Sequence, residues 1–255
     1  MIKKIILSII LIFLSSQSFA SGKSATSAHH PQDLKWEFDG FFGRFDKQSA
    51  QRGYQVYKEV CSSCHSMKRV AYRNLSDIGF GEDEIKQNAA EYLVVDGPDD
   101  SGDMFERPAL PSDRFVSPFE NENAARASNG GAYPPDLSLI IKARGNGANY
   151  VYSLLTGYEE APENFDLTVG KYYNPYFEGH QISMTPPIGD GLIEYQDGTS
   201  PTREQMAIDV VNFLQFAAEP EMEVRKQMGV KVMIFLAIMT ILFAIAKTLV
   251  WRQIK

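Results

Sequence analysis

The stretch Cys61-Ser62-Ser63-Cys64-His65 holds the only two cysteines of this 255-residue chain and places a histidine directly after the second. On a helical turn, positions i, i+3 and i+4 share one face. Two thiols on that face can each add across a vinyl group of a haem, while the imidazole from the same turn reaches the iron. The spacing therefore predicts haem attachment, with thioethers at Cys61 and Cys64 and an iron ligand at His65.

Three other uses of a cysteine pair remain open. A structural zinc ion needs four ligands, and of the four histidines only His180 lies far from both the motif and the pair His29-His30. A thioredoxin-like redox pair would follow a strand, whereas residues 49–60 before the motif are predicted to form a helix capped by Ser49. A disulfide across so short a loop recovers little chain entropy. Haem attachment is the favoured interpretation.

The N-terminus has the pattern of a secretory signal peptide. Lys3-Lys4 is followed by the apolar run 5–14 and then by small residues at Ser18-Phe19-Ala20. We expect residues 1–20 to be removed after Ala20 and residues 21–229 to form an exported haem domain. An uncleaved anchor is the alternative, although the apolar run is short for a membrane span. In bacteria, that places the domain in the periplasm, on the side of the inner membrane where haem is attached.

A second apolar segment lies near the C-terminus. Residues 230–250 contain only Lys231 and Lys247 as charges, one near each end, where a lysine can extend to the membrane surface. A helix of this length crosses a hydrocarbon core about 30 Å thick, and Trp251-Arg252 suits the interface. We expect a single-pass inner-membrane protein with residues 251–255 in the cytoplasm. A buried core helix is the alternative.

The charge of the chain is acidic. The formal net charge is −7, yet six of the 25 basic residues lie in the two apolar ends, which leaves 19 against all 32 acidic ones. Nucleic acid is therefore an unsuitable partner for the central domain.

The central region is predicted to be one mainly α-helical domain with long irregular loops. Its first and last helices are expected to cross, as in small c-type cytochromes that enclose a haem. Further expected elements are an aromatic-rich arm packed on the domain at 32–45, a loop at 96–113, helices at 136–143 and 148–156, and a helix that begins at Ser200-Pro201 and ends near Pro220.

The sixth iron ligand decides the chemistry, because methionine raises the reduction potential, whereas an open position suits gas or peroxide chemistry. Met67 is too close to the motif to reach the other face of the ring, and Met104 lies in an acidic loop. Met184 precedes the stiff Pro186-Pro187 and is the favoured ligand. His180 would give a bis-histidine site, and a core role for Met184 is the remaining alternative.

The haem propionates also need partners, since buried carboxylates without them are costly. Arg126, before the turn Asn129-Gly130-Gly131, can offer bidentate donors to a propionate. A surface arginine without that role is the alternative.

Several further blocks make nearly all of the chain beyond residue 20 resemble one family, cytochrome c1 of the ubiquinol-cytochrome c oxidoreductase (bc1) complex. Besides the haem motif, the blocks are Arg126-Ala127-Ser128-Asn129-Gly130-Gly131-Ala132-Tyr133-Pro134-Pro135-Asp136-Leu137-Ser138, Asn174-Pro175-Tyr176-Phe177, Met184-Thr185-Pro186-Pro187-Ile188, and Ala217-Ala218-Glu219-Pro220-Glu221 before the C-terminal anchor.

The resemblance implies one covalently attached haem c with its iron between His65 and Met184, and a propionate contact at Arg126. It also implies an electron carrier within quinol-cytochrome c reductase, in a dimeric complex with cytochrome b and the Rieske iron-sulfur protein. The Rieske protein would reduce the haem, and a soluble or membrane-tethered cytochrome c would accept the electron. A stand-alone anchored c-type cytochrome and an anchored haem gas sensor are the alternatives.

Four acidic clusters are expected to steer a basic cytochrome c toward the domain, although some of them belong to ordinary solvated surface. They are Glu82-Asp83-Glu84, 96–103, 120–122 and 159–163.

Overall fold

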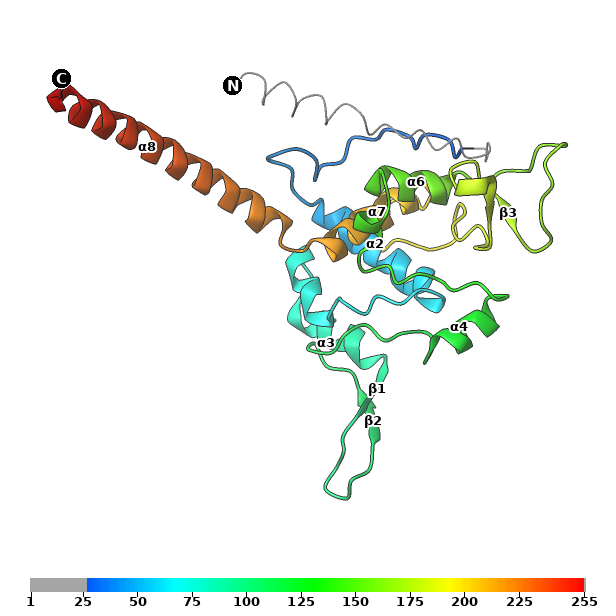
Figure 1. Ribbon diagram of the computed structural model, residues 1–255. Helices are drawn as coiled ribbons and strands as arrows, with labels where there is room; N and C mark the ends of the chain where they lie inside the picture. Colours follow the sequence, from blue (N-terminus) through cyan, green and yellow to red (C-terminus); the bar gives the residue numbers. More distant parts are fainter. Residues whose placement is uncertain (1–26, 255) are drawn as a thin grey trace, which may run out of the picture.

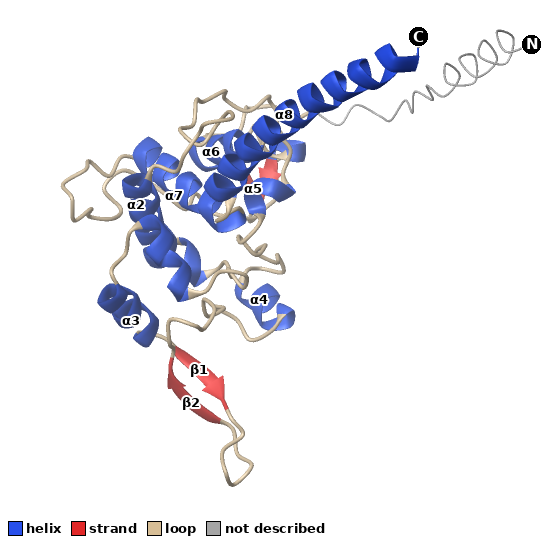
Figure 2. Ribbon diagram, turned by 90° about the vertical axis from the view of Figure 1, so that its left-hand side faces the viewer, coloured by secondary structure: helices blue, strands red, loops and turns tan. Residues whose placement is uncertain are grey.

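The domain is built on two crossed helices, α2 (Lys47–Glu59) and α7 (Arg203–Ala218). The computed structural model describes residues 27–254, so the predicted signal peptide lies outside the described residues. The two helices lie side by side at the centre of the domain (Figures 1 and 2). The predicted crossing of the first and last helices of the domain is confirmed, and α2 runs directly into the haem motif.

The backbones of α2 and α7 come closest at Gly53. A Cβ atom added there would lie 1.9 Å from the main-chain oxygen of Asp209 and 2.8 Å from Cβ of Phe213, so only glycine fits. The carboxylate of Asp209 is fully buried and accepts two hydrogen bonds of 2.9 Å from the Arg52 guanidinium. It also accepts one of 2.7 Å from the Ser49 hydroxyl. Backbone contact and a hydrogen-bonded ion pair therefore both fix the crossing.

Two further helices, α5 (Ile140–Ala143) and α6 (Gly147–Thr156), pack against α7. Apolar residues recur along α7 at helical spacing and bury almost completely, so this helix is the centre of the core. The largest fully buried apolar side chains of the domain are Tyr72, Phe213, Phe216, Met67, Leu75, Ile78 and Met206.

Short elements complete the described chain. They are η1 (Cys61–Ser63), η2 (Tyr72–Ile78), α3 (Glu82–Ala90), β1 (Leu93–Asp96), β2 (Phe105–Pro108), α4 (Glu122–Ser128), β3 (Tyr172–Tyr173), η3 (Glu178–His180) and β4 (Gln181–Ile182). β1 pairs antiparallel with β2, and β3 with β4, in two separate two-stranded sheets. The predicted class, a mainly helical domain with long irregular loops, is confirmed.

Two predicted helix caps are wrong. The carboxylate of Asp46 caps α2 by accepting from the Ser49 N–H at 3.0 Å, so the helix begins earlier than expected. The Thr202 hydroxyl caps α7 by accepting from the Gln205 N–H at 3.1 Å, so Ser200 lies outside the helix. In both cases the acceptor lies three residues before the N–H that it binds, as capping requires.

Two further boundaries also differ from the prediction. The helix expected at 136–143 is only α5, because the Asp136 carboxylate accepts from the Ser138 N–H at 2.9 Å and holds the preceding residues in a turn. The stretch 96–113 is not all loop, since β2 lies within it and forms a hairpin with β1 that projects from the domain (Figure 2).

The aromatic arm packs on the domain only in part. Trp36 and Phe38 are buried (8% and 6% exposed), and the Trp36 indole N–H donates to the Asn149 side chain at 2.6 Å. Phe41 and Phe42, by contrast, are 54% and 81% exposed. The expectation of core packing is therefore right for the first pair and wrong for the second.

The C-terminal helix α8 (Met222–Ile254) leaves the domain as a single rod (Figure 1). Within it, Met222–Arg252 has a mean hydropathy of 2.4 over its most apolar stretch, none of which is buried against the domain. Among residues 27–254 it is the one helix long and apolar enough to cross a membrane. The predicted single C-terminal membrane helix is consistent with this, and the helix itself starts eight residues before 230.

Candidate haem site

The motif forms one helical turn at the end of α2. The N–H groups of Cys64 and His65 both donate to the carbonyl of Cys61, at 3.1 and 2.9 Å. Both cysteines are free thiols, half-buried at Cys61 and exposed at Cys64, and they are not joined to each other. Burial raises the pKa of Cys61 to about 12, with a smaller contribution from Cys64, so its thiol stays protonated at neutral pH.

The imidazole of His65 is held in one orientation. Its Nδ1 lies 2.8 Å from the carbonyl oxygen of Pro135, and since a carbonyl only accepts, Nδ1 carries the proton. Burial lowers the pKa of His65, although the bond to Pro135 opposes this, and the ring is therefore neutral at pH 7. Nε2 keeps its lone pair, which is the form of histidine that binds a metal ion.

A short segment holds His65 and the residues that follow it in place. We call residues 135–138, which bond to residues 65–69, the proximal clamp. The Asp136 carboxylate accepts from the Ser66 hydroxyl at 2.8 Å and from the Lys68 N–H at 2.9 Å. The Leu137 N–H donates to the Ser66 carbonyl at 2.8 Å. Burial alone would raise the pKa of Asp136, but the hydrogen bonds that it accepts outweigh burial and lower it, so the clamp carries a charged carboxylate.

Met184 lies in the loop between β4 and α7 and is half-buried. The Tyr158 hydroxyl, just beyond α6, donates to the Met184 carbonyl at 3.1 Å. After it, Pro186-Pro187 leads to the buried Ile188. The methionine is thus fixed through its main chain, and no hydrogen bond among the described residues joins it directly to the motif.

Arg126 lies in α4 and is already engaged. Its guanidinium donates to the Glu122 carboxylate at 2.7 and 2.9 Å and to the Gly131 carbonyl at 3.0 Å, and it lies 5.5 Å from the centre of the Tyr133 ring. Tyr133 and Cys64 line one small crevice of about 20 Å³. Arg126 is therefore near the motif, but a propionate would compete with Glu122 for its donors.

Arg144 was not singled out from the sequence. It forms no ion pair with any residue from 27 to 254 and is exposed. It lies close enough to Tyr150 to oppose the rise in that group's pKa that burial causes. Burial, with a smaller contribution from Tyr150, raises the pKa of Tyr158, whose hydroxyl bonds to the Met184 carbonyl. The Arg144 guanidinium thus has no carboxylate partner within the described residues, and nothing in its sequence context signals this.

The alternative ligand His180 is held by contacts within its own loop. Its ring is buried, its Nδ1 lies 3.1 Å from the Pro175 carbonyl, and it packs against the rings of Tyr173 and His29 at centroid distances of 5.8 and 5.9 Å. Its φ angle of 58° belongs to the tight turn at this point. These contacts favour a role in holding the loop before Met184.

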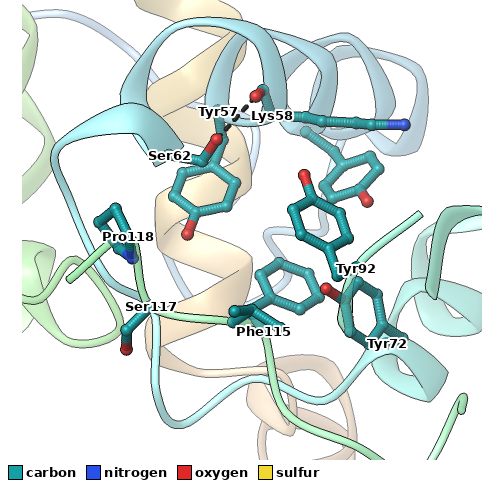
Figure 3. Close-up of a pocket in the computed structure, with 10 residues that line it drawn as sticks. Tyr57, Lys58, Ser62, Tyr72, Tyr92, Phe115, Ser117 and Pro118 are labelled. Atoms are coloured by element: carbon teal, nitrogen blue, oxygen red, sulfur yellow. Dashed lines mark hydrogen bonds between the residues drawn. The ribbon is translucent and has the colours of Figure 1, made fainter. Parts of the chain in front are cut away.

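A cavity beside Ser62 of the motif is too small for a macrocycle. Figure 3 shows it next to Ser62, whose hydroxyl donates to the Lys58 carbonyl at 2.7 Å. Its volume is about 110 Å³, below the roughly 300 Å³ at which ligand pockets begin. Its walls are aromatic and include Tyr57, Tyr72, Tyr92 and Phe115. It is a gap at the edge of the aromatic core.

The donor set fits a haem better than a bare metal ion. The part of the chain described here contains no cluster of three or more histidine, cysteine or acidic side chains that could hold a metal. What it does contain is two free thiols and a neutral imidazole with a free Nε2 on one turn. This combination suits two thioether bonds and one axial ligand.

Comparison with known proteins gives a consistent result. Residues 36–254 match the model of the Cytochrome C1 family. Over 242 residues the chain is 52% identical to cytochrome c1 of Rhodospirillum rubrum, covering 89% of this chain and 88% of that protein. It is 48% identical to a mitochondrial cytochrome c1 heme protein of Arabidopsis thaliana, covering 93% of this chain and 78% of that protein.

The name of a further relative describes it as a subunit of a complex. It is the catalytic subunit of the mitochondrial cytochrome b-c1 complex of Candida albicans, 45% identical over 246 residues, covering 96% of this chain and 85% of that protein.

Proposed function

Because the chain belongs to the cytochrome c1 family, we propose that it is the electron-carrying haem subunit of a cytochrome bc1 complex, accepting electrons from the Rieske iron-sulfur protein and passing them to a cytochrome c. The family binds a haem c, whose iron accepts and releases one electron. The subunit would serve quinol-cytochrome c reductase without making or breaking a bond of a substrate.

The observation that carries this proposal is the state of His65. Its Nδ1 donates to Pro135 and its Nε2 is free, on the same turn as two unbonded thiols. We infer that Cys61 and Cys64 hold the haem covalently and that His65 binds the iron. The proximal clamp then keeps the ring oriented, as outer-shell hydrogen bonds do at other metal sites.

Met184 is the proposed sixth ligand. The bond from Tyr158 to its carbonyl and the two prolines after it restrict the loop, so that the thioether is presented with little loss of entropy. A methionine in this position raises the reduction potential and keeps small ligands from the iron.

Arg126 and Arg144 are both candidate propionate partners. Arg126 could donate two hydrogen bonds to a propionate, but two of its N–H groups already donate to Glu122. Arg144 has no carboxylate partner among the described residues. A propionate bound at Arg144 would require no ion pair to break.

The placement in the cell follows from the two apolar ends. We propose that residues 1–20 direct export and are removed, and that residues 21–229 lie in the periplasm of a bacterium. Residues 230–250 of α8 would span the inner membrane once, with residues 251–255 in the cytoplasm. Cytochrome b and the Rieske protein would be neighbours in a dimeric complex.

The acidic clusters differ in their suitability for steering a basic cytochrome c. Glu82 and Asp83 are paired with Lys86, at 2.8 and 3.7 Å. The cluster Glu159-Glu160…Glu163, by contrast, has no cationic partner within the described range and directly follows Tyr158, which holds the Met184 loop. Its field is therefore uncompensated next to the proposed site.

Purification in mild detergent tests the proposal. We expect a covalently bound haem on a denaturing gel, no carbon monoxide binding to the reduced protein, and cytochrome b and the Rieske protein in the same fraction. A colourless chain would refute the site, and ready gas binding would refute the sixth ligand. A haem protein that purifies alone, even after gentle extraction, would instead indicate a stand-alone anchored cytochrome.

A further inference from the structure

One turn of the aromatic arm presents two large apolar side chains to solvent. Phe41 and Phe42 are 54% and 81% exposed, and their rings stack edge to face with centroids 5.2 Å apart. Trp36 and Phe38, in the same arm, are buried. We call residues 40–43 the phenylalanine turn. Its exposed rings need an explanation that core packing does not supply.

The phenylalanine turn is a defined structure. Gly40 has a φ of +69°, and a Cβ added at Gly43 would lie 2.1 Å from the Asp39 carbonyl oxygen, so both positions suit only glycine. The Arg44 N–H donates to the Glu37 carbonyl at 3.0 Å and closes the loop behind the turn. The two rings are thus held outward by the backbone.

The same turn is bonded to the base of α8. The Lys226 ammonium donates to the carbonyls of Phe38 and Gly43, at 2.6 and 3.3 Å. The Glu223 carboxylate accepts from the Phe45 N–H at 2.8 Å. Residues on both sides of the phenylalanine turn are therefore fixed to the first two turns of α8.

This attachment sets the height of the turn relative to a membrane. Lys226 lies four residues before the apolar stretch 230–250, which is about 6 Å along a helix. Figure 1 shows the arm on the side of the domain from which α8 leaves. We propose that the phenylalanine turn inserts into the interfacial layer of the bilayer, as a second membrane contact that fixes the tilt of the haem domain. This rests on α8 spanning the membrane.

The chemistry of the turn favours lipid as its partner. Phenylalanine has no polar group to satisfy, so its ring suits the boundary between headgroups and acyl chains. Arg44 is exposed next to the turn and can meet a lipid phosphate. Two contact points, α8 and the phenylalanine turn, restrict rotation of the domain in a way that a single helix does not.

Photo-crosslinking tests the contact in native membranes. The full-length, haem-loaded chain carries p-benzoylphenylalanine at position 42, and adducts are identified by mass spectrometry. Matched chains carry it at Phe235, exposed on α8, and at Val169, fully exposed on a loop. We expect phospholipid adducts at 42 and 235 and none at 169.

Each other outcome would overturn the proposal in a recognisable way. Adducts from position 42 to another polypeptide would make the turn a subunit contact. Lipid adducts at 235 but not at 42 would leave α8 in the membrane and the turn outside it. A lack of lipid adducts at both positions would show that α8 does not lie in the membrane, and would refute the proposed single-pass placement as well.

The effect on orientation is measured separately. The chain with Phe41→Ser and Phe42→Ser is reconstituted into oriented bilayers of zwitterionic and anionic phospholipid, and the linear dichroism of the haem band is recorded. We expect the double variant to lose dichroism relative to the native chain. The control Val169→Ser should keep the native dichroism. Because both rings are exposed, the thermal midpoint should not change. Full dichroism in the double variant would refute the orienting role.

Discussion

The closest contact between α2 and α7 provides a direct test of the fold around the haem motif. The variant Gly53→Ala adds one methyl group where the main-chain oxygen of Asp209 would lie 1.9 Å away and the Phe213 Cβ 2.8 Å away. Ordinary contact begins near 3.4 Å, so the helices must separate by about 1.5 Å. Neither neighbour is the end of a flexible side chain, so neither can turn aside.

The cost follows from two opposing effects. Overpacking a core costs about 1–3 kcal/mol, and the upper end applies here because main-chain and Cβ atoms must move. Alanine is the better helix former by about 1 kcal/mol, which offsets part of this. The net loss in the free energy of unfolding is therefore about 2 kcal/mol, or a fall of about 4–8 °C in the thermal midpoint of a domain of this size.

The measurement is the loss of circular dichroism in the haem band on heating the purified holoprotein in detergent. Gly229→Ala is the matched control, because Gly229 is also helical but would place its Cβ in open space. We expect the control to keep or slightly raise the midpoint. An unchanged midpoint in Gly53→Ala would refute the close crossing of α2 and α7.

Four other changes separate the roles proposed above. The pKa of Asp136 is lowered in the folded protein, so the charged carboxylate stabilises the fold above its ordinary pKa of about 4, and this stabilisation is lost as the pH falls through the lowered pKa. Asp136→Asn should therefore make the thermal midpoint fall less steeply on acidification. An equally steep fall in the variant would contradict this. Met184→Leu should let the reduced protein bind carbon monoxide and should lower its reduction potential, as titration would show. Arg144→Gln should lower the potential more than Arg126→Gln, whose charge Glu122 already offsets; the reverse order would favour Arg126 as the propionate partner. Neutralising the glutamates of 159–163 should slow reduction of cytochrome c and weaken its salt dependence, whereas neutralising the Lys86-paired acids of α3 should do neither by much.

The sequence was most informative where chemistry or periodicity repeats over several residues. The spacing of Cys61, Cys64 and His65 predicted one shared turn, and the apolar stripe of α7 predicted a buried last helix; both are found. The helix expected at 148–156 is α6, which starts one residue earlier. Such patterns survive because each depends on residues close together in the chain.

Features that depend on partners far away in the sequence were missed. Asp136 appeared to begin a helix, but its carboxylate binds Ser66 and Lys68, about seventy positions earlier. Ser49 appeared to be a cap, but its hydroxyl donates to Asp209, on the opposite helix. No local pattern distinguishes a capping side chain from one that bonds across the core.

The two kinds of contact around the motif have separate consequences for haem binding. The crossing at Gly53 and Asp209 positions α2, and so the turn that carries the two thiols. The proximal clamp instead orients the His65 ring through Pro135, from a segment that follows α4. A change in the crossing should therefore impair covalent attachment and stability together, since the thiols move with the helix. A change in the clamp should leave the haem attached and alter the iron ligand alone, so that the two can be distinguished by a haem-stained gel and a spectrum of the same sample.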